Sequence, residues 1–258
     1  MSYKIVFFDI DGTLLNKENR IPADTKEAVR CLKEQGIQVA IATGRSPYHL
    51  APIASELEID TYVSFNGSYV VCKGEVVYAN CLRQESLSRL EKTAKEHGHP
   101  LVYLSESECY ANSEQHPLVI ESFHYLSLDP PDCQADFWQG RSIYQAFLYC
   151  QEHEESKYVG MFPDVSFIRW YPYALDVLPA QGSKAKGIEA LLDHLGLSAA
   201  DAVAFGDGLN DREMLNFVGM GIAMGNAHEE VKSFADMTTR HVNNGGISYG
   251  LQKIGLIR

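Results

Sequence analysis

The sequence predicts an α/β protein with a doubly wound core built on a parallel sheet and interrupted by an inserted α+β domain. Two observations carry this prediction. Continuous apolar runs alternate with helical patterns in the first third of the chain and again after residue 183. The segment between them contains strand-like runs that are richer in polar and aromatic residues. We therefore expect a core of residues 1–81 and 183–258 and an insertion of residues 82–182.

The first third of the chain reads as strand, helix, strand and strand. Each predicted strand is an unbroken apolar run that stops at a polar residue near a glycine, a pattern typical of strands buried on both faces of a parallel sheet. The helix between the first two strands has one apolar side and closes at Gly36. The strands are expected at residues 4–9, 39–44 and 61–67, and the helix at residues 22–36.

The same alternation returns near the C-terminus. A helical pattern begins this part, with an apolar stripe formed by Ile188, Leu191, Leu192 and Leu195. Right-handed connections between parallel strands join these segments to the first third in one sheet. The helices are expected at residues 186–196 and 210–218, and the strands at residues 202–208 and 219–226.

The insertion is predicted to hold a mostly antiparallel sheet with two helices. A loop is expected at the Asp-Pro-Pro-Asp run, residues 129–132. Helices are expected at residues 85–97 and 119–125, and strands within residues 100–113, 142–151, 165–172 and 173–180.

Composition limits the possible partners and compartments. The formal net charge of -12, with dispersed basic residues, opposes binding to nucleic acid. Apolar runs stay well short of the roughly 18 residues that a membrane span needs, so no membrane partner is expected. The six cysteines show no metal-binding or redox spacing and read as free, mostly buried thiols. We expect a cytoplasmic protein without an obligate protein partner.

Polar residues lie at the ends of four predicted strands and should converge at one edge of the sheet. These residues are Asp9, Thr43, Asn66 and Asp207. Asp9 is also only two positions from Asp11, and like charges that close repel each other. A divalent cation such as Mg²⁺, which prefers oxygen ligands, would offset that repulsion.

Four short motifs occur in order along the chain: residues 9–14, DIDGTL; residues 43–45, TGR; a lysine near position 184; and residues 206–211, GDGLND. They resemble the motifs of the haloacid dehalogenase (HAD) superfamily. Its Cof-type phosphatases with a large type IIB α/β cap are similar in the "SFNGS" and "GIAMGNA" segments and in the place of the insertion. The resemblance implies a Rossmann-like core and a cap, residues 82–182, that selects the substrate.

The resemblance implies a phosphatase that acts on small phosphorylated metabolites. Asp9 would attack phosphorus and become an aspartyl phosphate, while Asp11 would act first as general acid and then as general base. Asp9, Asp207 and the backbone carbonyl of Asp11 would hold Mg²⁺. Asp211 would support these groups from behind.

The phosphoryl oxygens would be bound by hydrogen-bond donors and one cation. A lysine would supply the positive charge, and "GSKAKG" offers Lys184 and Lys186. Lys184 continues the apolar stripe of its helix and is therefore expected to face the sheet. The Lys-Gly pair that is common in the family is formed here by Lys186 and Gly187. We therefore assign the role to Lys184. The expected donors are the Thr43 hydroxyl, the N–H groups of Ile10 and Gly44, and Asn210.

Two other functions remain open at this point. A phosphomutase of the same superfamily would also need Asp11, but such enzymes usually carry a small helical cap. A non-enzymatic phospho-accepting regulatory protein would be phosphorylated on an aspartate at a strand end. Such a protein has no acid/base residue two positions after that aspartate. Hydrolysis of small substrates such as sugar phosphates accounts best for both Asp11 and the large insertion.

Overall fold

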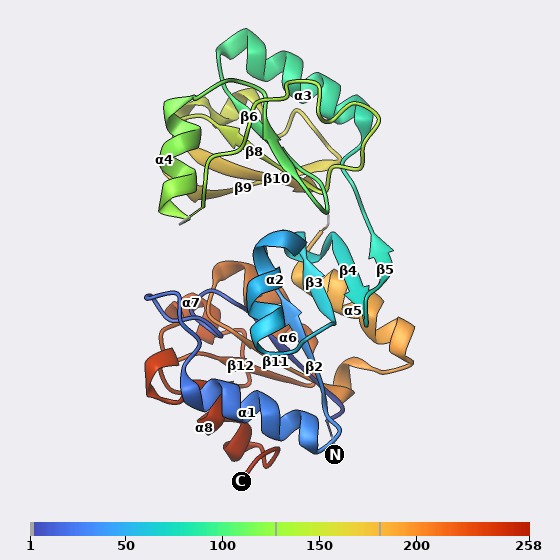
Figure 1. Cartoon of the computed structure of the whole chain (residues 1–258), viewed down its shortest axis with the longest axis vertical. Coiled ribbons are helices and arrows are strands. Elements are labelled where there is room, and N and C mark those ends of the chain that lie inside the picture. Colours follow the sequence, from blue (N-terminus) through green and yellow to red (C-terminus); the bar gives the residue numbers. More distant parts are fainter. Residues whose placement is uncertain (1–2, 127, 181) are drawn as a thin grey trace. The chain divides into compact units, whose positions relative to one another are not determined.

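The structure is a computed structural model that describes residues 3–126, 128–180 and 182–258 (Figure 1). It divides into two compact units, and each is described by itself. Of the described residues, the first unit contains 3–45, 49–79 and 183–258, and the second contains 46–48, 80–126, 128–180 and 182.

The first unit is built on one eight-stranded sheet with the order β13-β12-β11-β1-β2-β3-β4-β5. The strands from β13 to β3 pair in parallel, which confirms the predicted parallel sheet. The N-terminal strands are β1 (Ile5–Phe8), β2 (Gln38–Ala42), β3 (Tyr62–Ser64), β4 (Tyr69–Cys72) and β5 (Glu75–Ala79). The C-terminal strands are β11 (Ala202–Gly206), β12 (Met220–Ala223) and β13 (Met237–Thr238).

Helices cover both faces of this sheet. One cluster of buried side chains joins α1 and α8 to the sheet, and a second joins α5 and α6 to the opposite face. The helices are α1 (Ala23–Glu34), α2 (Pro47–Glu56), α5 (Lys184–Leu195), α6 (Arg212–Phe217), α7 (Glu229–Lys232) and α8 (Gly246–Lys253).

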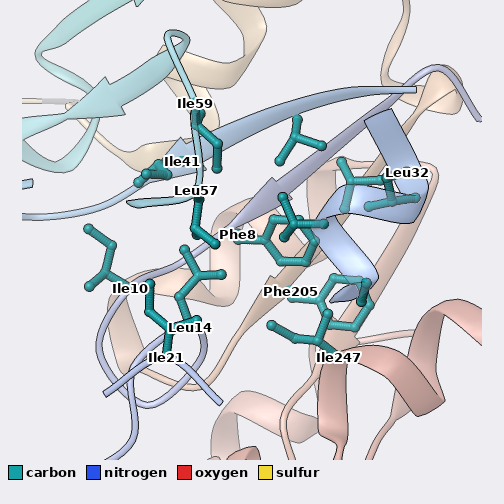
Figure 2. Packing of buried hydrophobic residues seen from close by; sticks show 14 of the residues in the cluster. Phe8, Ile10, Leu14, Ile21, Leu32, Ile41, Leu57, Ile59, Phe205 and Ile247 are labelled. Atoms are coloured by element: carbon teal, nitrogen blue, oxygen red, sulfur yellow. The ribbon is translucent and has the colours of Figure 1, made fainter. Parts of the chain in front are cut away.

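Strand β1 shows why the apolar runs are unbroken. Val6 and Phe8 belong to the cluster on the α1 face, whereas Ile5 and Phe7 belong to the cluster on the α5 face. All four side chains are fully buried, because successive residues of a strand point to opposite faces. Figure 2 shows the α1-side cluster, in which the rings of Phe8 and Phe205 stack with centroids 5.2 Å apart.

Two of the differences from the predicted core lie at the end of the sheet beyond β3 and at the start of α6. Strands β4 and β5 form an antiparallel hairpin that extends the sheet beyond β3, and its turn is made by Lys73 and Gly74. The helix expected at residues 210–218 is shorter, because a 3₁₀ turn, Leu209–Asp211, precedes α6.

The second unit has a five-stranded antiparallel sheet in the order β7-β6-β8-β10-β9. The strand expected within residues 100–113 is two strands, because the Ser105 hydroxyl accepts hydrogen bonds from the N–H groups of Ser107 and Glu108 and reverses the chain. The strands are β6 (Leu101–Leu104), β7 (Cys109–Ala111), β8 (Gln145–Tyr149), β9 (Val165–Tyr171) and β10 (Ala174–Pro179), and the helices are α3 (Gln84–His97) and α4 (Pro117–Tyr125).

The six cysteines are free, but the expectation that most are buried is wrong. Cys72 and Cys150 are buried, whereas Cys81 and Cys133 are exposed. Cys81 and Cys133 lie outside the regular helices and strands, where side chains reach solvent more easily. In the described part of the chain, every helix is too short or too polar to cross a membrane.

Helix α5 approaches the sheet closely through two glycines. A Cβ on Gly187 would lie 2.4 Å from a methyl carbon of Val63 and 2.8 Å from the Cα of Gly67. Gly67 itself has a φ of 100°, and a Cβ there would lie 1.9 Å from the Ser183 carbonyl oxygen. The first turn of α5 therefore lies against the loop that follows β3, which only residues without a side chain permit.

We expect Gly187→Ala to destabilise the protein by about 2–3 kcal/mol, because the added methyl group overpacks this contact. Helix propensity alone predicts the opposite sign, a gain of roughly 1 kcal/mol. Urea unfolding measures the difference. Gly36→Ala is the control: nothing lies within 4 Å of its Cβ position, so only its φ of 75° should cost about 1 kcal/mol. A neutral or stabilising Gly187→Ala would contradict the close approach of α5.

Candidate active site

The polar residues that follow the parallel strands lie at one edge of the core sheet. Strand β1 lies between β11 and β2, with Phe8 opposite Phe205 on one side and Ile41 on the other. The chain therefore leaves these three strands at the same level, just before Asp9, Thr43 and Asp207. Asn66 follows β3 within the turn Phe65–Gly67. This edge is the place that the sequence predicts for the site.

A buried lysine joins two carboxylates at this edge. The Nζ atom of Lys184 lies 2.6 Å from Oδ1 of Asp9 and 2.6 Å from Oδ1 of Asp211. The side chains of Lys184 and Asp211 are fully buried, and that of Asp9 is 8% exposed. Lys186, two residues later, instead points to solvent and pairs with Glu189. The structure thus brings Lys184, and not Lys186, to the predicted site.

Burial and charge shift the pKa values of this cluster. Burial, reinforced by the negative charge of Asp211, raises the pKa of Asp9 well above its ordinary value although Lys184 acts in the opposite direction. Burial of Lys184 acts to lower its pKa, but the carboxylates of Asp211 and Asp9 outweigh this effect and raise it above the usual range. The lysine is therefore held in its charged form.

Asp211 organises the loop after β11. Its Oδ2 atom accepts hydrogen bonds from the N–H groups of Asp207 and Gly208, each at 2.9 Å, while its Oδ1 atom is bound by Lys184. Three donors thus occupy the Asp211 carboxylate. This arrangement orients Asp207 and Lys184.

The cluster fits a divalent metal ion. Asp9, Asp207 and Asp211 each offer a carboxylate oxygen, and these oxygens lie within 4.8 Å of one another. Three carboxylates and the one ammonium of Lys184 leave a formal charge of -2, which a divalent cation would neutralise. Burial, followed by the negative charge of Asp211, raises the pKa of Asp207 to about 6. Nearby positive charge is therefore too weak to offset these two effects on the Asp207 carboxylate.

The loop after β1 makes room for Asp207. Gly12 has a φ of 82°, and a Cβ at this position would lie 2.1 Å from Oδ2 of Asp207. Any side chain at residue 12 would displace that carboxylate. The Asp207 carboxylate therefore lies directly against the peptide that follows Asp11.

Asp11 is held by Arg45 in an arrangement that the sequence analysis did not anticipate. The guanidinium donates to both carboxylate oxygens, with Nε–Oδ2 at 3.0 Å and Nη2–Oδ1 at 2.6 Å. The Asp11 side chain is 60% exposed, in contrast to the buried Asp9. Two carboxylates separated by one residue thus have different environments, one buried beside Lys184 and one in contact with solvent.

The predicted phosphate donors have different surroundings. The hydroxyl oxygen of buried Thr43 accepts the N–H of Arg45 at 3.1 Å, so its own hydrogen is left to donate. The Ile10 side chain belongs to the core, and only its backbone can serve the site. The Nδ2 atom of Asn210 donates one hydrogen bond to Oδ1 of Asn66 at 2.9 Å, and its second hydrogen is left for the expected contact with phosphate. The Asn66 amide in turn lies against Gly44, whose Cβ position is 3.0 Å from Nδ2 of Asn66.

The sequence analysis assigned no functional role to three residues that lie at the site: Arg45, Asn66 and Asn226. Arg45 stands inside the TGR motif and Asn66 follows a predicted strand, so their positions carried a signal. Asn66 and the preceding Phe65 both adopt left-handed backbone angles, with φ of 51° and 49°, an uncommon pair outside glycine. Asn226 lies in the "GIAMGNA" segment, and its contacts depend on loop geometry that no local pattern reveals.

Comparison with known proteins agrees with this geometry. Residues 6–251 match the family of haloacid dehalogenase-like hydrolases. The chain is 42% identical over 258 residues to YkrA of Bacillus subtilis (strain 168), which carries the name of a phosphatase, with all of both chains covered.

Solved structures show the same fold over nearly the whole chain. A hypothetical protein from Geobacillus kaustophilus HTA426 is 48% identical, with a TM-score of 0.96 over 99% of this chain and 100% of that one. The HAD subclass IIB sugar phosphatase BT4131 is 31% identical, with a TM-score of 0.86 over 98% of this chain and 100% of that one. The chain belongs to the haloacid dehalogenase-like hydrolases and is an enzyme of their phosphatase group.

Proposed function

We propose that the protein hydrolyses small phosphorylated metabolites, sugar phosphates among them, through an aspartyl-phosphate intermediate on Asp9 with Mg²⁺ as cofactor. The observation that carries this proposal is the cluster of Asp9, Asp207, Asp211 and Lys184, three of them buried, with its formal charge of -2. The similarity to a sugar phosphatase supports the substrate class. The cytoplasm is the proposed location, since the cysteine spacing favours a reducing compartment.

In the first step, a carboxylate oxygen of Asp9 attacks phosphorus, and the bond from phosphorus to the leaving oxygen breaks. Asp11 gives its proton to that oxygen, which leaves as an alcohol. Lys184 holds the Asp9 carboxylate through Oδ1 and so limits its rotation. Burial of Asp9 leaves its carboxylate poorly hydrated. This favours attack on phosphorus once a divalent cation neutralises the negative charge of the cluster.

In the second step, Asp11 takes a proton from water, and the water oxygen attacks phosphorus. The bond between phosphorus and the Asp9 oxygen breaks, which releases inorganic phosphate, restores the Asp9 carboxylate and leaves Asp11 protonated for the next cycle. Arg45 donates hydrogen bonds to both oxygens of the Asp11 carboxylate and so orients it for this step. The N–H groups of Ile10 and Gly44 and the Thr43 hydroxyl are the proposed donors to the phosphoryl oxygens.

Mg²⁺ would be held by Asp9, Asp207 and the Asp11 carbonyl, and when bound it neutralises charge on the transferring phosphoryl group. Asp211 is proposed to act through Lys184 and the Asp207 N–H rather than on the metal, because three donors already occupy it. Residues 82–182 are proposed to select the leaving group of the substrate.

Asp9→Asn should abolish phosphate release from a panel of sugar phosphates with Mg²⁺, because an amide oxygen is a poor nucleophile toward phosphorus. The measurement is inorganic phosphate formed per enzyme, which also distinguishes hydrolysis from return of the phosphoryl group to sugar. Glu189→Gln, an exposed carboxylate outside the site, is the control. Substantial turnover by folded Asp9→Asn would remove Asp9 from the nucleophile role.

Asp11→Asn should slow both chemical steps but allow transfer from a substrate with an acidic leaving group, which needs no proton from the enzyme. Labelled phosphate should then accumulate on the protein as a base-labile adduct. Asp9→Asn/Asp11→Asn is the control and should carry no label. Absence of label from Asp11→Asn, despite release of the leaving group, would contradict the covalent intermediate.

Lys184→Met should lower kcat/KM by about 100-fold or more, because the pocket loses its only buried cation within the described residues. Lys186→Met removes an exposed pair with Glu189 and should stay within about twofold of wild type. Circular dichroism must show that both variants are folded. Equal losses in the two variants would contradict the special place given to Lys184.

A further inference from the structure

The side chain of Asn226 connects three separate segments at the edge of the sheet. Its Nδ2 atom donates to the carbonyl oxygen of Gly12 at 2.8 Å and to Oδ2 of Asp207 at 3.0 Å. Its Oδ1 atom accepts the N–H of Val242 at 2.9 Å. One amide therefore ties the loop after β1, the loop after β11 and the turn Val242–Asn244 together.

The orientation of this amide is fixed by chemistry. The Val242 N–H can only donate, so the atom facing it must be the oxygen of Asn226. The nitrogen must then face the two acceptors, the Gly12 carbonyl and the Asp207 carboxylate. All these contacts match donor to acceptor, and the side chain has no equally good alternative orientation.

The backbone under Asn226 is also anchored. The N–H of Met224 donates to the Gly206 carbonyl at 2.9 Å, and that of Gly225 donates to the Arg240 carbonyl at 2.9 Å. Gly206 directly precedes Asp207, so the segment that carries Asn226 is bound to the end of the strand that carries the carboxylate. The amide thus acts from a fixed base.

Asn226 restrains two of the groups proposed to hold the metal. It bonds one oxygen of Asp207 directly, while the Thr13 hydroxyl lies 3.5 Å from the other oxygen. It also holds the Gly12 carbonyl, and the Gly12 N–H donates to the Leu15 carbonyl at 2.9 Å. Because a trans peptide is planar, the Asp11 carbonyl points opposite to that N–H. The Asp11 carbonyl thus belongs to a peptide whose N–H is bound by Leu15, and the next peptide is held through its Gly12 carbonyl by Asn226.

We propose that Asn226 is a positioning residue that fixes the spacing between Asp207 and the Asp11–Gly12 loop, and that this spacing makes the site prefer Mg²⁺ over the larger Ca²⁺. The inference rests on the proposed function for the presence of a divalent metal. Mg²⁺ requires a compact, near-octahedral set of oxygens, whereas Ca²⁺ accepts longer and more variable distances. Ligands that cannot move apart favour the smaller ion.

The test is direct metal binding without substrate. Mn²⁺ is titrated into the full-length protein and followed by electron paramagnetic resonance, and Mg²⁺ and Ca²⁺ then compete for the site to give the ratio of their affinities. If wild-type protein binds no Mn²⁺, the metal part of the proposed function fails before Asn226 is tested. The variants are Asn226→Ala and Asn226→Asp, with Asn243→Ala as a matched control that removes only an exposed hydrogen bond with Asn16.

Asn226→Ala should weaken Mn²⁺ binding about 10-fold or more, the range typical when a residue that orients metal ligands is removed. Asn226→Asp still accepts the Val242 N–H but repels both the Gly12 carbonyl and Asp207. Its added charge attracts Mg²⁺ and Ca²⁺ alike, so the ratio of the two affinities isolates geometry and should fall toward one. Asn243→Ala should match wild type in both measurements.

Wild-type Mn²⁺ affinity in folded Asn226→Ala, or a wild-type ratio of Mg²⁺ to Ca²⁺ affinity in Asn226→Asp, would overturn the proposal. If Asn226→Ala does not fold, the ratio in Asn226→Asp decides, because that variant keeps the bond to the Val242 N–H. A role limited to holding the fold would change the unfolding midpoint and leave the ratio unchanged.

Discussion

The buried ammonium of Lys184 is the contact on which the rest of the site depends. It lies between Asp9 and Asp211 and places a positive charge within 2.6 Å of an oxygen of each, in a site closed to water. Removal of one partner from a buried ion pair typically lowers the free energy of unfolding by about 3–5 kcal/mol, because the remaining charge is left buried without a partner. Asp211 transmits this constraint to the N–H groups of Asp207 and Gly208. A single cation thus fixes the end of β1, the start of α5 and the loop after β11.

The position of that ammonium is a consequence of backbone packing. Lys184 is the first residue of α5, and the helix reaches the sheet because Gly187 and Gly67 allow backbones to touch. A lysine at a helix N-terminus is opposed by the helix dipole, so the two carboxylates must offset both this effect and the loss of hydration. The close approach and the ion pairs are therefore mutually dependent: without the glycine contact the ammonium would not reach Asp9.

The sequence predicted what depends on periodicity and strand ends. Unbroken apolar runs identified β1, β2, β3 and β11, and the rule for parallel sheets placed the residues that follow them at one edge. The helical stripe through Ile188 and Leu191 predicted correctly that Lys184 faces the sheet. These signals are local, and each can be read from a short stretch of chain.

Contacts between distant loops could not be predicted in the same way. The pairing of Asp11 with Arg45 depends on how the turns after β1 and β2 bend. Asn226 contacts three segments, and one of them, at Gly12, lies more than 200 residues away in the sequence. The turn between β6 and β7 was not predicted, because a polar stretch of sequence fits the continuation of an edge strand as well as it fits a turn. Side-chain amides that can donate and accept leave no periodic trace, so their partners emerge only with the fold.

The order of strands in the core sheet also constrains how the chain is made. Strand β1 lies inside the sheet, where Ile5 pairs with Gln38 on one side and with Ala202 on the other. During synthesis from the N-terminus, the first partner emerges early, whereas the second must wait for the insertion and α5. Until then an entirely apolar strand presents an open edge, the kind of surface that promotes aggregation of partly made chains. The pairing of β1 on its second side and the assembly of the Asp9–Lys184–Asp211 cluster are therefore late events that share one cause, the arrival of residues 184–211.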